Sequence, residues 1–174
     1  VWESQALTRA RPVAGDESLC EKLVSEIPVI LSNVKAKADL KSEISKMRRL
    51  IEKEKGSKET WDIKTGRGGL LDIEFIAQWL VLENADGSAY PTQTREVIQQ
   101  LGSNCLSAAD LETLINSHDQ FMHILHLQRT CIGDANLDED LPSGFQEVLC
   151  TALDLPDLTA ANAHLSELKD GVRS

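Results

Sequence analysis

Residues 61–82 read WDIKTGRGGLLDIEFIAQWLVL, and this stretch decides the fold and the site that we expect for the chain. Its first part, from Lys64 to Gly69, brings three glycines and two cations together. Glycine permits positive φ angles and lets backbone amides approach a ligand closely. Successive amides in such a turn can form a concave anion-binding site, to which Lys64 and Arg67 would add positive charge.

The second part, from Leu70 to Leu82, is apolar on nearly every side, which predicts a buried helix. Only Asp72, Glu74 and Gln78 interrupt it. Glu74 and Gln78 lie four residues apart and share a helix face, while Asp72 in the first turn suits the positive end of the helix dipole. A basic, glycine-rich turn that leads into a helix N-terminus is typical of a phosphate site.

A purely structural interpretation of these residues stays open. Gly68 and Gly69 could form a connector, and Asp72 could be an N-cap. Glu74 and Gln78 could be a satisfied polar pair. The spacing is not that of a Walker A loop, nor that of Gly-x-Gly-x-x-Gly after a strand. The residues alone therefore indicate a phosphate-facing turn without deciding it.

The length of 174 residues suits one domain with a real core. No apolar run approaches the roughly 18 residues of a membrane span, so no membrane partner is expected. Four scattered cysteines favour a reducing cytoplasm over a disulfide framework or a zinc site. The chain starts at Val1 with a plausible helix, so we expect residues 1–174 to be a single helical domain cut from a longer multidomain enzyme.

The net charge of −10 is distributed unevenly. Residues 1–69 hold 14 Lys and Arg against 11 Asp and Glu, whereas residues 70–174 hold 4 against 17. So acidic a chain is not expected to bind nucleic acid in general. The basic part could still face a phosphate that a neighbouring domain holds, and the acidic part could be a solvated surface or a surface for a protein partner.

Hardly any stretch alternates with period two, so the expected fold class is all-α, a bundle of about seven to eight helices. Residues 61–64 should be extended. In the second helix, Leu19, Leu23, Val24 and Ile27 should face the core, and Pro28 should kink or break the helix. In the sixth, the core side should hold Leu111, Leu114, Ile115, Phe121, Met122 and Leu125. The expected helices cover residues 1–11, 16–28 (capped by Asp16), 39–55, 70–82, 92–101, 107–131 (capped by Ser107), 143–153 and 157–169.

Other groups give weaker signals. His123 and His126 are three residues apart but lack further ligands at zinc spacing. The segment from Asp134 starts like an EF-hand, yet its sixth and twelfth positions are not Gly and Glu. We therefore expect no metal site in the chain. Near the N-terminus, Gln5 and Arg9 share a helix face, and their spacing fits an ion-pair role and a substrate-facing role equally well.

Two segments resemble the bifunctional glutamine-synthetase adenylyltransferase/adenylyl-removing enzymes of bacteria: residues 2–16, WESQALTRARPVAGD, and residues 62–78, DIKTGRGGLLDIEFIAQ. The first segment is more like the C-terminal, adenylylating half of those enzymes. The second keeps the residues of the family motif, which are Lys64, Gly66, Gly68, Gly69, Asp72, Glu74, Phe75 and Gln78. The resemblance implies a helical domain of the nucleotidyltransferase substrate-binding type, which follows a nucleotidyltransferase domain and packs against its active site.

In that family the preceding domain carries a Gly-Ser and an Asp-x-Asp pair that holds Mg²⁺, and neither occurs here in that context. The resemblance implies transfer of AMP from ATP to a tyrosine of glutamine synthetase, in the cytoplasm, as a control of nitrogen assimilation by glutamine and the PII signal protein. ATP and Mg²⁺ would serve the full enzyme, with neither held tightly by this fragment. In such chemistry the protein mainly positions groups and neutralises charge.

The resemblance assigns site roles to residues of both motifs, although no catalytic residue is certain in the fragment. Lys64 and Arg67, with the amides of Gly66, Gly68 and Gly69, would face the cleft and hold the ATP phosphates or the junction of AMP and tyrosine. Supporting residues would orient that loop or contact nucleotide or metal indirectly; they are Asp72, Glu74 and Gln78, with Arg9 and Arg11 at the same cleft.

Two alternatives stay open. The chain could be the equivalent domain of a PII uridylyltransferase, or of the deadenylylating half of the bifunctional enzyme. It could also be a non-catalytic interaction module that binds glutamine synthetase or PII through its acidic part.

Overall fold

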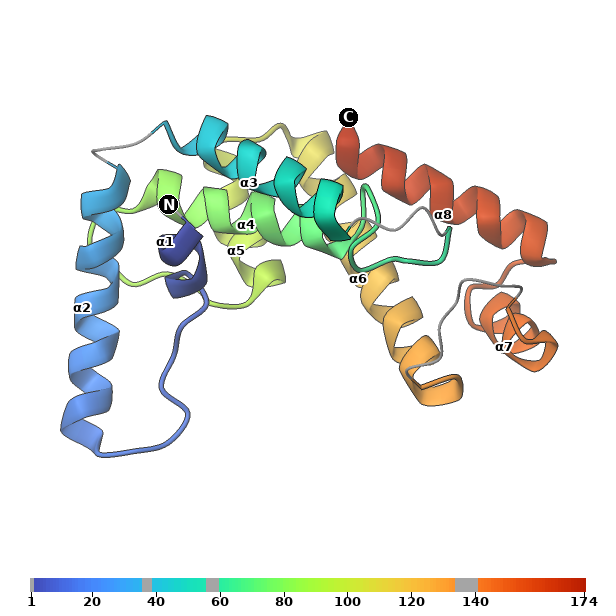
Figure 1. Cartoon of the computed structure of the whole chain (residues 1–174), viewed down its shortest axis with the longest axis horizontal. Helices are drawn as coiled ribbons and strands as arrows, with labels where there is room; N and C mark the ends of the chain where they lie inside the picture. The colour runs from blue at the N-terminus through green and yellow to red at the C-terminus, as the bar shows by residue number, and fades with distance from the viewer. Residues whose placement is uncertain (1, 36–38, 56–59, 134–140) are drawn as a thin grey trace. The chain divides into compact units, whose positions relative to one another are not determined.

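The computed structural model describes residues 2–35, 39–55, 60–133 and 141–174, and all regular secondary structure in these ranges is helical (Figure 1). The all-α prediction is confirmed. The elements are α1 (Trp2–Leu7), α2 (Glu17–Lys35), α3 (Leu40–Lys55), α4 (Leu70–Asn84), α5 (Thr94–Leu101), a 3₁₀ helix η1 (Gly102–Asn104), α6 (Ala108–Cys131), α7 (Ser143–Ala152) and α8 (Leu158–Arg173). The EF-hand-like segment from Asp134 falls outside the described residues. Within them, no helix is long and apolar enough to cross a membrane.

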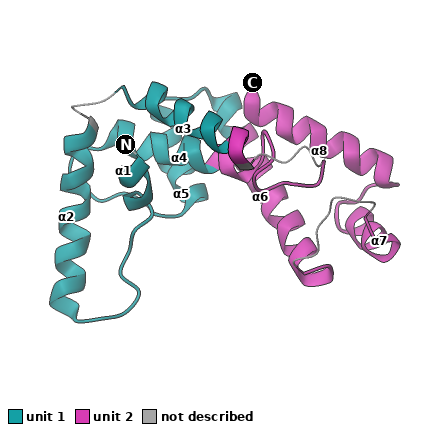
Figure 2. Cartoon of the chain, viewed as in Figure 1, with its two compact units in different colours: residues 1–51, 74–111 teal, residues 52–73, 112–174 magenta. Residues whose placement is uncertain are grey.

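The chain divides into two compact units (Figure 2). Unit 1 contains residues 1–51 and 74–111, and unit 2 contains residues 52–73 and 112–174. Each unit is therefore built from two separate stretches of sequence. The glycine turn belongs to unit 2, and the N-terminal helix α1 belongs to unit 1.

The buried helix predicted from Leu70 onward is confirmed. No residue of α4 is exposed, and Ile73, Leu80 and Leu82 are fully enclosed. This burial agrees with the absence of a polar stripe in its sequence. Apart from Leu80 and Leu82, the buried apolar residues of unit 1 include Ile27, Leu31, Leu40, Ile44, Ala77, Val81, Val97 and Ile98.

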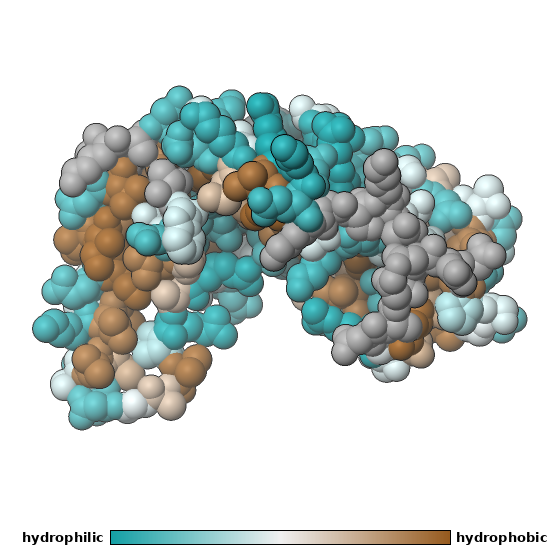
Figure 3. All heavy atoms as spheres, in the orientation of Figure 1, coloured by the Kyte–Doolittle hydropathy of each residue, from teal (hydrophilic) through white to brown (hydrophobic). Residues whose placement is uncertain are grey.

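Helix α2 differs from the prediction in two ways. Leu19, Leu23 and Val24 are about half exposed, at 58%, 46% and 52%, and do not join the core. Only the C-terminal part of α2, around Ile27 and Leu31, is buried, because the earlier turns extend beyond the packed part of unit 1 (Figure 1). Apolar side chains consequently lie on the surface of α2 (Figure 3).

Pro28 does not end α2, which continues to Lys35. A proline inside a helix removes one backbone hydrogen bond. Here Ile27 and Leu31 are buried on both sides of Pro28, and their burial favours continuation of the helix. Helix α1 is also shorter than expected: it ends at Leu7, where Thr8 Oγ1 donates to the carbonyl of Gln5 at 2.7 Å.

The predicted caps are confirmed. Asp16 accepts a hydrogen bond from the amide of Leu19 at 3.1 Å, and Ser107 Oγ accepts one from the amide of Asp110 at 3.2 Å. Such side chains satisfy amides that have no partner inside the helix. Helix α8 starts in the same way, with Asp157 accepting from the amide of Ala160 at 2.8 Å, and it runs four residues further than expected, to Arg173.

Unit 2 contains the glycine turn, most of α6, and all of α7 and α8, and α7 contacts α8. The buried stripe of α6 is not the predicted one, because it includes two polar residues and omits four of the expected apolar ones. Its members are Leu114, Ser117, Phe121, Ile124 and Gln128. The other buried apolar residues of this unit include Trp61, Ile63, Leu70, Phe145, Leu149, Ala161, Leu165 and Leu168.

Candidate functional site

The segment that leads into the glycine turn is itself a turn, which corrects the expectation of an extended segment at residues 61–64. The amide of Ile63 donates to the carbonyl of Trp61 at 2.9 Å, and both side chains are buried. Burial of Trp61 and Ile63 would also fit a strand, where residues i and i+2 share a face, but a hydrogen bond between residues only two apart closes a tight turn. The bend brings Asp62 next to the amides that follow it.

Asp62 organises the first half of the turn. Its carboxylate accepts hydrogen bonds from the amides of Lys64 at 3.1 Å and Thr65 at 2.8 Å, and from Thr65 Oγ1 at 2.5 Å. Burial acts to raise the pKa of Asp62, but the hydrogen bonds from Thr65 and from the amides of Gly66 and Lys64 outweigh it, so the pKa lies below its ordinary value of 3.8. The turn is therefore stabilised by an ionised carboxylate.

The lowered pKa gives a testable pH dependence. Because the folded pKa lies below the unfolded value of 3.8, the stabilisation by Asp62 is fully present above that pH and is lost as the pH falls through the folded pKa. Asp62→Asn should lower the free energy of unfolding by about 1 kcal/mol at pH 7, and this difference from the parent chain should shrink as the pH is lowered toward 2. Urea unfolding across that range measures it. A difference that is constant with pH would contradict the assignment; Glu3→Gln, at an exposed position, is the control.

The three glycines of the turn are required by close backbone packing. A Cβ added at Gly66 would lie 2.2 Å from the carbonyl oxygen of Asp62, and one at Gly69 would lie 2.5 Å from that of Ile63. At Gly68, φ is +77° and a Cβ would lie 2.3 Å from the carbonyl oxygen of Lys169 in α8. No side chain fits at these positions without moving the backbone, so the turn is a tightly packed element of unit 2.

Several amides of the turn have acceptors inside the chain. The amide of Gly68 donates to the carboxylate of Asp72 at 2.5 Å, and the amide of Gly69 donates to the carbonyl of Gly66 at 3.0 Å. The amide of Leu70 donates to the carbonyl of Ile63 at 2.8 Å. Asp72 thus ties the turn to the start of α4. The amides of Gly68 and Gly69 are therefore used within the chain, whereas the residues Lys64 and Arg67 are exposed to solvent.

Lys64 and Arg67 are both exposed. Arg67 Nε lies 3.5 Å from Glu52 Oε1, with 63% and 38% of the two side chains exposed. Exposed ion pairs of this kind contribute at most about 1 kcal/mol, so Arg67 can exchange Glu52 for another anion at little cost. Lys64 makes no ion pair with another described residue. The turn therefore offers solvent two cations on a rigid backbone, which is the chemistry that binds phosphate.

Two residues that the sequence analysis missed hold the turn from other helices. Lys169 Nζ of α8 donates to the carbonyls of Thr60 at 2.7 Å and Asp62 at 3.2 Å. Gln128 of α6 donates from Nε2 to the carbonyl of Trp61 at 3.1 Å, and it is buried. The only sequence signal for Gln128 is its register, three and four residues from apolar positions of α6. Nothing in the sequence marks Lys169.

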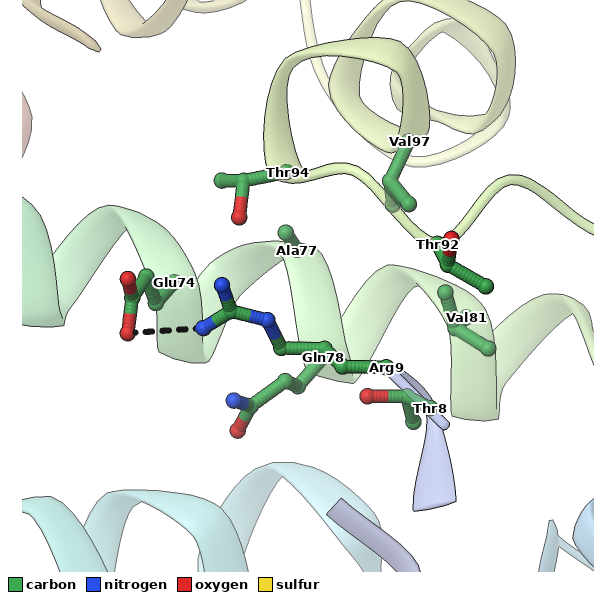
Figure 4. Close-up of a pocket in the computed structure, with 9 residues that line it drawn as sticks. All are labelled: Thr8, Arg9, Glu74, Ala77, Gln78, Val81, Thr92, Thr94 and Val97. Carbon is green, nitrogen blue, oxygen red and sulfur yellow. Dashed lines mark ion pairs between the residues drawn. The ribbon is translucent and has the colours of Figure 1, made fainter. Parts of the chain in front are cut away.

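The other predicted site residues lie in unit 1, where α1 and the residues just after it contact α4 through polar pairs. Arg9 Nη1 lies 3.2 Å from Glu74 Oε2 (Figure 4), and Gln5 Nε2 donates to Gln78 Oε1 at 2.9 Å. Next to them is a small pocket with room for little more than one water molecule, too small for a nucleotide. It is lined by Thr8, Arg9, Glu74, Ala77, Gln78, Val81, Thr92, Thr94 and Val97. Arg11 is exposed beyond α1.

These contacts predict a small structural effect for the Arg9–Glu74 pair. The two side chains are 49% and 32% exposed, so Arg9→Gln or Glu74→Gln should each lower the free energy of unfolding by less than about 1 kcal/mol. The double variant should lose no more than the larger single loss, since each single change already removes the pair. Urea unfolding measures all three. A double variant that loses the sum of the two single losses would contradict the pairing.

Among the described residues, no group of three or more His, Cys, Asp and Glu side chains could hold a metal ion. In the glycine turn, the carboxylates of Asp62 and Asp72 accept hydrogen bonds from its amides. The solvent-facing groups, Lys64 and Arg67, are cations. The donor set of the turn therefore fits an anion such as a phosphate and does not fit Mg²⁺.

Comparison with known proteins gives one family and a set of relatives. The family model described as GlnD PII-uridylyltransferase matches residues 38–173. Bifunctional glutamine synthetase adenylyltransferase/adenylyl-removing enzymes are similar over nearly the whole chain: the one from Rhizobium meliloti (strain 1021) is 40% identical over 99% of the chain, and the one from Mesorhizobium japonicum is 35% identical over 99%. The one from Bartonella quintana is 30% identical over 100%. No solved structure matches.

The extent of these matches differs in an informative way. The chain spans only 18% of the length of each of these three relatives. The family model starts at residue 38, after α1 and α2, whereas the relatives match these helices as well. The N-terminal segment 2–16 therefore belongs to the similarity with the bifunctional enzymes and lies outside the part that the family model matches.

Proposed function

The chain belongs to the GlnD PII-uridylyltransferase family and is homologous to the bifunctional glutamine synthetase adenylyltransferase/adenylyl-removing enzymes, and from this premise we propose that it assists AMP transfer. In this proposal it is the helical domain of such an enzyme, and the longer protein moves AMP from ATP to a tyrosine of glutamine synthetase. ATP and Mg²⁺ would be held mainly by a nucleotidyltransferase domain elsewhere in that protein.

The observation that carries the proposal is the exposed pair of cations, Lys64 and Arg67, on a turn whose backbone is fixed by glycine packing and by Asp62. Phosphoryl-type transfer needs charge neutralisation and accurate positioning more than it needs acid–base chemistry. A preorganised cation adds to the rate because it does not have to reorient as negative charge develops. Lys64 and Arg67 would bind phosphate oxygens of ATP, or the phosphate that joins AMP to tyrosine.

The remaining residues of the turn would act indirectly. Gly66, Gly68 and Gly69 allow the close packing, and Asp72 connects the turn to α4 through the amide of Gly68. In unit 1, Glu74 and Gln78 position α1 through Arg9 and Gln5. Arg11, exposed just beyond α1, makes no ion pair with another described residue and would be available to a neighbouring domain or to nucleotide.

A PII uridylyltransferase is the second candidate, because the matching family model carries that description. The match of α1 and α2 to the bifunctional enzymes, outside the family model, favours adenylyl transfer. The acidic residues 70–174 support a further role, in which this surface binds glutamine synthetase or PII. That role is compatible with AMP transfer by the longer protein.

The nucleotide and the protein substrate distinguish these activities. The full-length protein is incubated with Mg²⁺ and either ATP plus glutamine synthetase or UTP plus PII, and the nucleotide joined to tyrosine is identified by mass spectrometry. We expect AMP on glutamine synthetase. UMP on PII would replace the proposal by the uridylyltransferase. Binding of either protein with no transfer of nucleotide would leave only the interaction module.

A further inference from the structure

We propose that Lys169 is a positioning residue for nucleotide transfer, which acts through the glycine turn and Lys64 without touching the substrate. The inference rests on the proposed function of the turn. It adds a residue near the C-terminus, in α8, to a site that sequence motifs place between residues 62 and 78. The juxtaposition that carries it is the contact of one lysine with both ends of the turn.

The amine of Lys169 binds the start of the turn. Nζ donates to the carbonyl oxygens of Thr60 at 2.7 Å and Asp62 at 3.2 Å, which lie more than a hundred residues away in sequence. Two of its three hydrogens are thereby used on backbone groups. Since the carboxylate of Asp62 accepts from the amide of Lys64, the position of the Asp62 backbone determines where the Lys64 backbone lies.

The backbone of Lys169 contacts the far half of the turn. Gly68 is so close that a Cβ there would lie 2.3 Å from the Lys169 carbonyl oxygen and 3.0 Å from its Cα. Lys169 therefore contacts backbone that comes before Lys64 in the sequence, through its amine, and backbone that comes after Arg67, through its main chain. A residue in this place limits the movement of both cations.

The surroundings of the amine indicate a built contact rather than a surface lysine that happens to lie near. Lysine is seldom buried unless it is paired. Burial lowers the pKa of Lys169, and the negative charge of Asp62 partly opposes this effect. The cost of partial burial is offset by the two carbonyl hydrogen bonds and by Asp62.

The test uses the full-length enzyme with Lys169→Met, which keeps an apolar stem and removes the donors. We expect kcat for AMP transfer to fall about 10- to 100-fold, since a displacement of the order of 1 Å in a positioned group can cost this much. The KM for glutamine synthetase should not change. Lys46→Met is the matched control: Lys46 is an exposed lysine whose ion pair is with Glu43 of its own helix, and its removal should leave kcat unchanged.

A double-mutant cycle with Lys64→Ala separates positioning from general stability. If Lys169 acts through Lys64, Lys169→Met should have little further effect on kcat once Lys64 is alanine. Effects that multiply would overturn the inference, as would an unchanged kcat for Lys169→Met. Should Lys169→Met fail to fold, Lys169→Gln, which keeps a donor on a shorter chain, replaces it in the same cycle with the same expectation.

The failure of this inference is distinguishable from the failure of the proposed function. If Lys64→Ala alone leaves AMP transfer unchanged, the proposed role of the turn is wrong and the role of Lys169 is wrong with it. If Lys64→Ala slows transfer but Lys169→Met does not, the turn keeps its role and only the positioning by α8 is wrong.

Discussion

Replacement of Lys64 by alanine in the full-length enzyme should slow AMP transfer to glutamine synthetase by about 100-fold. Removing one preorganised group that stabilises transition-state charge costs about 2.7–4 kcal/mol in known enzymes, or roughly 10²–10³ in rate. Lys64 is exposed and its side chain makes no ion pair with another described residue, so its removal leaves no buried charge without a partner. The stability of the chain should therefore change by less than about 0.5 kcal/mol.

The measurement is the initial rate of AMP incorporation at saturating ATP, together with thermal unfolding of the same preparation. Lys64→Arg keeps the charge and should retain much more activity than Lys64→Ala. Lys46→Ala, on the exposed face of α3, should behave as the parent enzyme does. An unchanged rate for Lys64→Ala with normal folding would exclude the turn from the transfer step.

Arg67 should contribute less than Lys64 does. Its guanidinium already lies 3.5 Å from Glu52, so part of its field is neutralised before any phosphate arrives. The structure therefore predicts a larger contribution to transfer from Lys64 than from Arg67, whereas the sequence alone does not distinguish them.

Local features of the fold could be predicted from the sequence because neighbours along the chain determine them. The caps at Asp16 and Ser107 depend on a side chain and an amide three residues later. The burial of α4 follows from its lack of a polar face. These features need no knowledge of which helices pack together.

Features that depend on long-range packing could not be predicted. Leu23 and Val24 have the spacing of a core face, yet the sequence does not show that this part of α2 extends beyond the packed part of unit 1. In α6, Gln128 is buried because it donates to the carbonyl of Trp61, 67 residues earlier in the chain. Lys169 contacts the turn from a still greater distance in sequence.

The glycines of the turn show how one pattern can fit two physical causes. Three glycines close in sequence to two cations predict amides that are free to bind phosphate. In the structure the glycines serve close packing against Asp62, Ile63 and Lys169, and the amides of Gly68 and Gly69 have acceptors within the chain. Both causes select glycine, so only the contacts around a turn can distinguish them.

Gly68→Ala should lower the free energy of unfolding by roughly 2–4 kcal/mol. A non-glycine residue with a positive φ such as +77° costs about 1–2 kcal/mol. The new methyl group would also meet the backbone of Lys169 at 2.3 Å, and overpacking of this kind typically costs a further 1–3 kcal/mol. Since the obstacle is the main chain of α8, it cannot be relieved by a side-chain rotation.

Gly87→Ala separates the cost of backbone strain from the cost of the steric contact in Gly68→Ala. Gly87 also has a positive φ, +91°, but a Cβ there would meet no atom within 4 Å. Its substitution should therefore cost only the backbone strain, or about 1–2 kcal/mol. Urea unfolding of both variants of the 174-residue chain measures the difference. Equal losses would mean that the contact between Gly68 and Lys169 is loose, and a turn that is loose there could not hold Lys64 in place for transfer.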